Sequence, residues 1–218
     1  MYFHDRAEAG DKLADELTAY RWENTAVLAL SPGGVAVGEQ IARRLHCALS
    51  LLLTSRISAP GDESLVIGTM DQTGGFTYNS MIPAGEMEEY MQDMRSYVEE
   101  QKLQQMYRMA SVVGEHGQAD PAQLEGRNVI IATDGVKNGL SFDAALNFLS
   151  RIRVEKTIAA IPVGPAEVIE RIHSLVDETH YLYIPEAFFS VKHYYTDEPE
   201  IDPASVTERI DNVVARWI

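Results

Sequence analysis

Short apolar runs alternate with amphipathic stretches along most of this chain. Apolar runs at residues 25–30, 48–54, 64–69, 128–133, 157–163 and 180–185 predict buried strands. Apolar side chains recur at helical spacing in residues 5–20, 35–46, 86–108, 142–152, 165–176 and 203–217, which predicts helices there. Strand, helix, strand with short connections is typical of right-handed parallel crossovers. The pattern therefore predicts an α/β fold, an open and mostly parallel sheet with helices on both faces.

Two stretches depart from this rhythm. Residues 74–79 read as the hairpin partner of the strand at 64–69, because Gly74 and Gly75 can form the turn between them. Residues 114–127 are rich in glycine, histidine and charge and predict a loop. We find no internal repeat and no linker, so we expect residues 1–218 to form a single domain.

Composition narrows the class of protein. With 45% hydrophobic and 23% charged residues, the chain has an ordinary globular balance. No apolar run reaches the roughly 20 residues of a membrane helix, and the first residues lack the pattern of a secretory signal. The single cysteine, Cys47, cannot form an internal disulfide and lies on an apolar helix face, where packing is its expected role. We therefore expect a cytoplasmic protein that does not bind membranes.

The net charge argues against nucleic acid as a ligand. The chain has 33 acidic and 18 basic residues, a formal charge of −15, and no basic stripe. An acidic surface also repels small polyanions. Any phosphate site must therefore rely on backbone donors, a few bases or a divalent metal.

The loop after residue 133 is the first candidate site. Ligands of open parallel sheets bind beyond the carboxyl ends of the strands, so the loops after residues 30, 133 and 163 are the places to examine. Asp134 ends a predicted strand and Ser141 begins a helix, where free amides and a hydroxyl can hold a phosphate. Asp134 can accept hydrogen bonds from ribose hydroxyls, Gly135 and Gly139 let the backbone approach a ligand, and Lys137 adds a charge. A plain turn with a helix cap explains the same residues equally well.

The loop after residue 30 is the second candidate. It contains Ser31, Pro32, Gly33 and Gly34, and two glycines after a buried strand can expose amides suited to a diphosphate. A turn that simply requires two glycines is the alternative.

Residues 134–141, DGVKNGLS after an apolar strand, are similar to the signature of the type I phosphoribosyltransferases. Further segments at 3–10, 30–37, 59–61, 67–68, 125–127 and 185–195 resemble one bacterial branch of that family. The resemblance covers nearly the whole chain.

The resemblance implies a function and a set of site residues. Members of the family bind 5-phosphoribosyl 1-diphosphate with Mg²⁺, held through the diphosphate, and transfer the phosphoribosyl group to a nitrogen base. By carry-over, Asp134 is the catalytic residue. The phosphosugar would be bound by Thr133, Asp134, Gly135, Val136, Lys137, Asn138, Gly139, Leu140 and Ser141, and the diphosphate by Ser31, Pro32, Gly33, Gly34 and Arg56. The resemblance also implies a small hood from the chain ends, residues 1–24 and 185–218, and a homodimer.

Departures from the family pattern leave two functions open. Thr133 replaces one of two usual acids, Pro32 replaces a usual arginine, and Ser55 replaces a common base beside Arg56. Losing one preorganised electrostatic partner costs on the order of 10²–10³ in rate. One hypothesis is an active phosphoribosyltransferase; the other is a catalytically inactive protein of the same fold that senses a phosphosugar or nucleotide, or serves as a scaffold.

The remaining candidate residues carry weaker signals. The aromatic residues of the late segment either stack on a base or pack in the core or a dimer contact; they are Phe188, Phe189, Tyr194 and Tyr195. The histidines, among them His116, His173, His180 and His193, lack the spacing of metal ligands, so we predict no metal site made by the protein alone.

Overall fold

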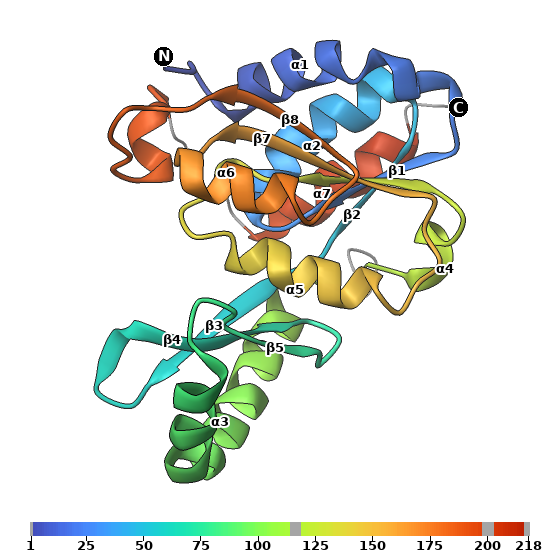
Figure 1. Cartoon of the computed structure of the whole chain (residues 1–218). Helices are drawn as coiled ribbons and strands as arrows, with labels where there is room; N and C mark the ends of the chain where they lie inside the picture. Colours follow the sequence, from blue (N-terminus) through green and yellow to red (C-terminus); the bar gives the residue numbers. More distant parts are fainter. Residues whose placement is uncertain (1, 114–118, 198–202, 216–218) are drawn as a thin grey trace.

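Five parallel strands form the central sheet of the computed structural model, which describes residues 2–113, 119–197 and 203–215. Their order is β2-β1-β6-β7-β8 (Figure 1). The bounds are β1 (Thr25–Ala29), β2 (Ala48–Leu51), β6 (Asn128–Ala132), β7 (Lys156–Val163) and β8 (Glu178–Tyr183). From β1 the chain proceeds to β2 on one side, whereas β6 leads to β7 and β8 on the other. The strand order therefore reverses between β1 and β6, which is where open α/β sheets form a ligand crevice.

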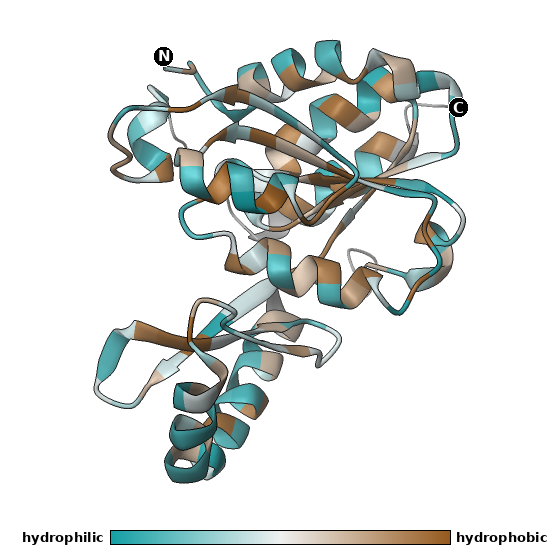
Figure 2. Ribbon diagram, in the orientation of Figure 1, coloured by the Kyte–Doolittle hydropathy of each residue, from teal (hydrophilic) through white to brown (hydrophobic). Residues whose placement is uncertain are grey.

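Helices cover both faces of this sheet, and each face has its own apolar core. The helices α1 (Arg6–Glu16), α2 (Pro32–Leu45) and α7 (Pro203–Ala215) pack on one face, with Val27 and Ala29 of β1. The opposite face, with Ala26 and Leu28, carries α4 (Pro121–Leu124), α5 (Leu140–Leu149) and α6 (Ala166–His173). Successive residues of a strand point to opposite faces, so a strand buried on both sides must be apolar throughout. Figure 2 shows the strands as hydrophobic bands between the two helix layers.

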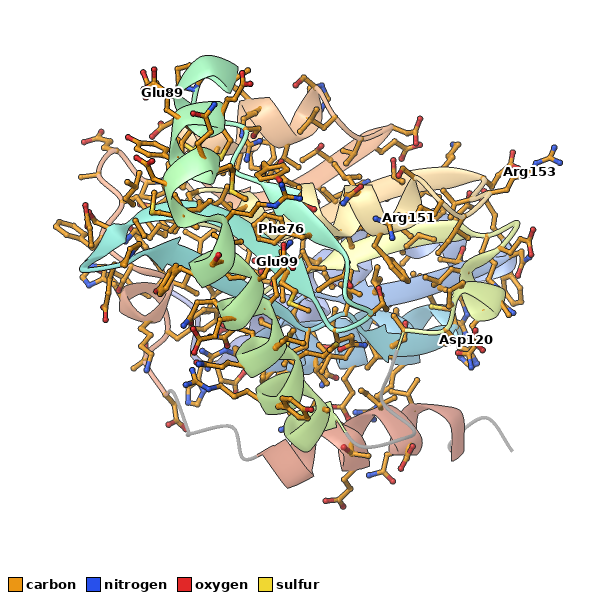
Figure 3. All side chains as sticks on the ribbon, turned by 90° about the horizontal axis from the view of Figure 1, so that it is seen from below. Phe76, Glu89, Glu99, Asp120, Arg151 and Arg153 are labelled. Atoms are coloured by element: carbon orange, nitrogen blue, oxygen red, sulfur yellow. The ribbon has the colours of Figure 1, made fainter. Side chains whose placement is uncertain are left out.

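Residues 54–113 form a second lobe with its own core. The strands β3 (Thr54–Ala59), β4 (Asp62–Asp71) and β5 (Phe76–Tyr78) form an antiparallel sheet, and α3 (Ala84–Val113) packs on it (Figure 1). Figure 3 shows α3 crossing the sheet with Glu99 beside Phe76. Lys102 links the two, because its Nζ lies 2.7 Å from Glu99 and 4.4 Å from the centre of the Phe76 ring. The lobe meets the main body at α5, where the Asn147 side chain donates to the Thr77 hydroxyl at 2.9 Å.

The N-terminal segment and the segment that ends near residue 195 meet beside the carboxyl end of β7. Phe3 and Tyr195 form a parallel bridge, and the amide of Phe3 donates to the carbonyl of Tyr194 at 2.8 Å. Two short 3-10 helices complete the described elements: η1 (Thr18–Trp22) lies between α1 and β1, and η2 (Val191–Tyr194) immediately precedes Tyr195. The predicted hood, residues 1–24 and 185–218, lies partly outside the described residues, and its covering of a ligand stays a prediction.

The predicted fold class, an α/β fold with a mostly parallel sheet, is confirmed, while several element boundaries differ. The apolar run at 48–54 is not one strand: β2 ends at Leu51, and a strand that the pattern did not predict, β3, begins at Thr54. In β3 only Ile57 and Ala59 are buried, so it lacks the continuous apolar run of a central strand. The hairpin predicted at 64–79 is present but belongs to the second lobe.

Helix boundaries differ in a similar way. The second helix begins at Pro32 rather than at residue 35, and α3 extends beyond the predicted 86–108 at both ends. The predicted loop at 114–127 contains α4, and its residues 114–118 lie outside the described part, as do residues 216–217 of the predicted last helix. No helix among the described residues combines the length and apolar character needed to span a membrane.

Candidate functional site

A cavity of about 190 Å³ opens at the carboxyl ends of β1 and β6, where the strand order reverses. Its lining consists of Leu30, Ser31, Arg56, Thr133, Asp134, Gly135, Val136, Lys137, Asn138, Gly139, Ser141 and Phe142. All of the residues predicted to bind a phosphosugar line it except Leu140, which is buried behind it. Of the residues predicted to bind a diphosphate, Ser31 and Arg56 line the cavity, whereas Pro32, Gly33 and Gly34 do not.

The loop from β6 to α5 is held by its own short-range hydrogen bonds. The Thr133 hydroxyl donates to the carbonyl of Gly135 at 3.0 Å, and the amide of Val136 donates to Val163 of β7 at 2.9 Å. Gly139 has φ 73°, a left-handed conformation that favours glycine, and it immediately precedes α5. The loop therefore turns sharply into the helix.

This turn leaves backbone donors at the start of α5. The amide of Leu140 donates a hydrogen bond to Asn138 Oδ1 at 3.3 Å. Among the described residues, the amides of Lys137, Asn138, Gly139 and Ser141 have no acceptor in the protein. Unpaired amides and the positive end of a helix dipole together form a favourable site for an anion. The Ser141 hydroxyl, which accepts a hydrogen bond from Thr54 of the second lobe at 3.2 Å, lies in the same cavity.

Asp134 is held by contacts from three other parts of the chain. Its carboxylate accepts a hydrogen bond from Arg6 Nε at 2.9 Å and from the Ser31 hydroxyl at 3.2 Å. Its backbone carbonyl accepts from the Tyr195 hydroxyl at 2.6 Å. The Arg6 side chain is 11% exposed and that of Asp134 is 16% exposed, so this ion pair is largely shielded from water. Charge-assisted bonds fix the carboxylate of Asp134, and the hydrogen bond from Tyr195 fixes its backbone.

The two glycines of the first loop lie outside the cavity lining: Gly33 packs against this ion pair, and Gly34 packs against the backbone at the end of β6. Ser31 caps α2, with its hydroxyl accepting from the amide of Gly34 at 2.9 Å, and Pro32 is the first helical residue. A Cβ at Gly33 would overlap the Asp134 carboxylate and would lie 2.8 Å from Arg6 Nε. Gly33 thus allows α2 to approach Asp134 closely, and Gly34 allows it to approach the backbone of Ala132 and Thr133.

Three contacts of this site had no clear signal in the sequence. Arg6 lies in the first turn of α1, where a cation is disfavoured by the helix dipole, so its position there could have indicated a partner elsewhere. Tyr195 was one of the late aromatic residues, and it is buried with Tyr194 in a small core around Phe3. Arg171 of α6 contacts the loop from behind, and nothing in its local sequence indicates this.

The other candidate residues lie away from the cavity lining. Phe189 is 69% exposed, and Phe188 packs on the ring of Tyr194. No group of three or more potential metal ligands occurs among the described residues, and His116 lies outside them. Cys47 is buried, and burial raises the pKa of its thiol to about 12.

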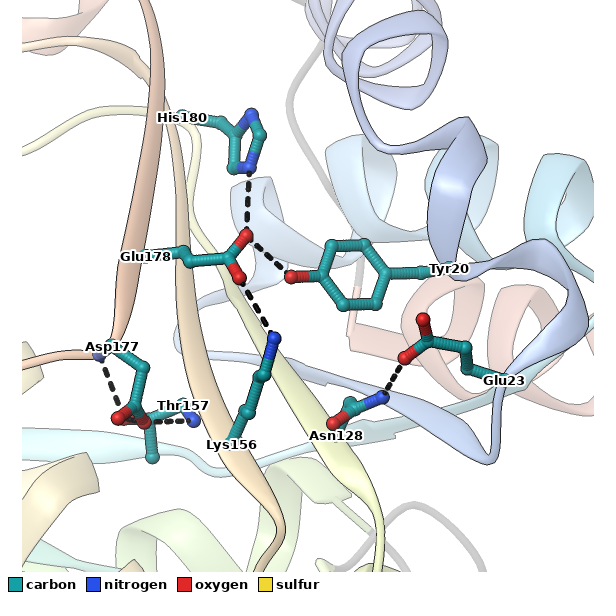
Figure 4. Close-up of polar contacts among 8 residues, drawn as sticks. All are labelled: Tyr20, Glu23, Asn128, Lys156, Thr157, Asp177, Glu178 and His180. Atoms are coloured by element: carbon teal, nitrogen blue, oxygen red, sulfur yellow. Dashed lines mark hydrogen bonds and ion pairs between the residues drawn. The ribbon is translucent and has the colours of Figure 1, made fainter.

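A network of charged side chains occupies the opposite edge of the sheet, where β6, β7 and β8 begin (Figure 4). Glu178 accepts from the Tyr20 hydroxyl and, at 3.0 Å, from Lys156. Burial and the neighbouring Glu178 raise the pKa of Tyr20, and the hydrogen bonds from Tyr20 and Lys156 lower the pKa of Glu178. Because the strands are parallel, this edge lies far from Asp134. The residues with these shifted pKa values, Tyr20 and Glu178, therefore stabilise the fold and take no part in the cavity.

Known proteins resemble this chain over most of its length. The model of the phosphoribosyl transferase domain matches residues 3–196. The chain belongs to the phosphoribosyl transferase family. A protein of Mycobacterium tuberculosis, provisionally named a phosphoribosyl transferase in strains H37Rv and CDC 1551, is 28% identical over 96% of this chain. This chain covers 46% of that protein, so it spans about half the length of the curated relatives that it matches.

One solved structure is similar to this chain over its whole length. The crystal structure of TT1426 from Thermus thermophilus has a TM-score of 0.76 and 28% sequence identity, and the match covers 100% of this chain and 99% of that one. The phosphoribosyl transferase fold predicted from the sequence is thus confirmed.

Proposed function

We propose that the cavity binds the ribose 5-phosphate portion of 5-phosphoribosyl 1-diphosphate or of a nucleoside 5-phosphate. One observation carries this proposal: four unpaired amides at the start of α5 and the carboxylate of Asp134 line the same cavity. The amides and the Ser141 hydroxyl suit a phosphate monoester. A carboxylate at the end of the adjoining strand suits the vicinal hydroxyls of a ribose.

The size of the cavity supports a small ligand portion. Pockets for drug-sized molecules enclose roughly 300–1,000 Å³, and this cavity encloses about 190 Å³. It therefore suits a phosphate and one pentose, with the rest of a larger ligand outside. Lys137 and Arg56 are exposed at its margin and add positive charge in an otherwise acidic protein.

The family membership supports transfer of the phosphoribosyl group to a nitrogen base. In that reaction the bond between C1 and diphosphate breaks and its electron pair leaves with the diphosphate. The lone pair of the base nitrogen forms the new bond to C1, and the proton on that nitrogen passes to solvent. The chain's own contribution is to hold the 5-phosphate and the ribose hydroxyls while C1 gains positive charge. Asp134 supplies negative charge near the ribose.

Mg²⁺ is the cofactor that this proposal requires. Asp134 is the only carboxylate among the described residues that line the cavity, and it is paired with Arg6. This donor set fits an Mg²⁺ ion held mainly by diphosphate oxygens and water, as is usual for magnesium at phosphate sites. When bound, the ion would offset the charge of the departing diphosphate.

A catalytically inactive phosphosugar or nucleotide sensor is the second candidate function. Pro32, Gly33 and Gly34 are part of α2 and stand outside the cavity lining, so they do not offer amides to a diphosphate there. A cavity lined by the residues at the start of α5 but not by these three favours a binder of monophosphates. The single buried thiol of Cys47 supports a reducing, cytoplasmic setting for either function, and we carry over the homodimer as an expectation from the family.

Calorimetric titration distinguishes these functions. Ribose 5-phosphate, adenosine 5-phosphate and 5-phosphoribosyl 1-diphosphate would each be titrated with and without Mg²⁺. Mg²⁺-dependent binding of the diphosphate sugar supports the transferase, and binding of monophosphates alone supports the sensor. Absence of binding by all three would contradict both.

Asp134→Asn tests the site assignment. We expect affinity for ribose 5-phosphate to fall at least about tenfold, because a charged hydrogen-bond acceptor contributes about 1.5–3 kcal/mol. Turnover, where present, should be abolished. The matched control is Glu89→Gln, an exposed acid on α3 (Figure 3). Because the ion pair between Arg6 and Asp134 is lost, circular dichroism must first show that the variant is folded. Unchanged ribose 5-phosphate affinity in a folded D134N would remove Asp134 from the site.

A further inference from the structure

Arg171 of α6 lies directly behind the loop that carries the unpaired amides. Its Nη2 donates to the carbonyl of Asn138 at 3.0 Å, and its Nη1 donates to Asp143 Oδ1 at 2.7 Å. A Cβ at Gly139 would overlap the Arg171 guanidinium. The arginine side chain is 28% exposed and that of Asp143 is 10% exposed, so this contact is partly shielded from water. Arg171 does not line the cavity itself.

The hydrogen bond to Asn138 determines which way a neighbouring amide points. In a trans peptide the carbonyl and the following N–H point in opposite directions. The carbonyl of Asn138 is drawn toward Arg171, on the side away from the cavity. The N–H of Gly139 in the same peptide unit must therefore point to the other side, where Gly139 lines the cavity. The orientation of this amide is thus coupled to the arginine.

The ion pair with Asp143 removes an electrostatic conflict. Asp143 lies in the first turn of α5, the same helix start that would receive the phosphate. An unpaired carboxylate there would compete with or repel a bound anion. Arg171 offsets this charge with one nitrogen while the other holds the loop. Asp143 Oδ2 also accepts from Ser80 of the second lobe at 3.1 Å, so the acid has a partner for each oxygen.

We infer that Arg171 is a positioning residue for the 5-phosphate loop and a determinant of affinity for phosphate monoesters of pentoses. It acts through the Asn138–Gly139 peptide and through Asp143, without touching the ligand. A planar guanidinium with two parallel donors can serve both acceptors, whereas a lysine ammonium presents a single point charge. This inference rests on the proposed binding of a phosphate ester in the cavity.

Substitution of Arg171 tests the inference with ribose 5-phosphate as the probe. Arg171→Met retains most of the side-chain length but removes the hydrogen bonds to Asn138 and Asp143, together with a longer one to the Ser80 hydroxyl at 3.5 Å. We expect its affinity for ribose 5-phosphate, measured by calorimetry, to fall about ten- to a hundredfold. Arg171→Lys should retain the positive charge beside Asp143 and should therefore lose less affinity for ribose 5-phosphate than Arg171→Met. Arg151→Met, an exposed arginine just after α5, is the matched control and should bind as the wild type does (Figure 3).

Two further readouts separate positioning from general destabilisation. Hydrogen exchange without ligand should be faster in R171M at the amides of Leu140 and Asp143, which donate to Asn138 Oδ1 and to the carbonyl of Gly139, with the central strands unchanged. Millimolar guanidinium should restore part of the ribose 5-phosphate affinity of Arg171→Ala but should leave that of R151M unchanged. If R171M does not fold, R171K and the guanidinium rescue carry the test.

The failure of this inference is distinct from failure of the proposed function. A wild-type protein that binds no ribose 5-phosphate would overturn the binding proposal. A wild-type protein that binds it, together with a folded R171M of equal affinity, would overturn only the role of Arg171.

Discussion

Gly33→Ala tests the geometry around Asp134 through the stability of the protein as well as through ligand binding. Gly33 lies in the first turn of α2, and a methyl group there would overlap the Asp134 carboxylate and crowd Arg6 Nε at 2.8 Å. Either the carboxylate must leave Arg6 or the start of α2 must move. We therefore expect the variant to be less stable and to bind ribose 5-phosphate more weakly.

The magnitude follows from three opposing effects. Alanine in place of glycine favours a helix by up to about 1 kcal/mol. Overpacking a tight contact costs about 1–3 kcal/mol. Loss of a hydrogen bond between charged groups costs about 1.5–3 kcal/mol more. The net change in the free energy of unfolding should be a loss of about 2–4 kcal/mol, which lowers Tm by at least about 4 °C for a chain of this length.

Gly85→Ala is the matched control for this experiment. Gly85 lies in the first turn of α3, and no atom lies within 4 Å of the position that its Cβ would take. Its substitution should leave stability unchanged or raise it by up to about 1 kcal/mol. Urea denaturation followed by circular dichroism measures both variants. If Gly33→Ala proved as stable as Gly85→Ala and bound the ligand normally, the close packing of α2 on Asp134 would be refuted.

Two further predictions concern ionisable groups away from the cavity. Glu178 has a pKa below its ordinary value of 4.5, so the stability that it contributes is present above pH 4.5 and is lost as the pH falls through its folded pKa. Glu178→Gln should therefore lower the free energy of unfolding by less than about 1 kcal/mol at pH 7, because the pair with Lys156 is exposed. Denaturation at a series of pH values should show that the difference between the variant and the wild type shrinks in acid. A difference that stays constant would contradict the lowered pKa of Glu178. Burial raises the pKa of the Cys47 thiol to about 12, so this thiol should resist alkylation in the native protein at pH 8 and react fully in urea. Rapid labelling of the folded protein would contradict the burial of the thiol.

The local pattern of apolar residues was sufficient to predict the helices and strands of the main body. The strand at 128–133 is apolar at every position except its first and last, as burial on both faces of a parallel sheet requires, and the observed β6 is fully buried. The same pattern placed Asp134 at the carboxyl end of a strand and Ser141 at the start of a helix. The prediction of one strand at residues 48–54 was wrong, because a short apolar run does not indicate whether the chain continues in one sheet or passes into another.

The sequence by itself determined the fold class, the family and the loop at which a phosphate ester is expected, because each depends on residues close together in the chain. Only the tertiary structure decided what surrounds that loop. Arg6 meets Asp134 across 128 positions, and Arg171 meets Asn138 across 33. The spacing of apolar residues specifies which face of an element is buried. It carries no information about which distant charged side chain will pair with another, since that choice is made only when the sheet and its helices pack together.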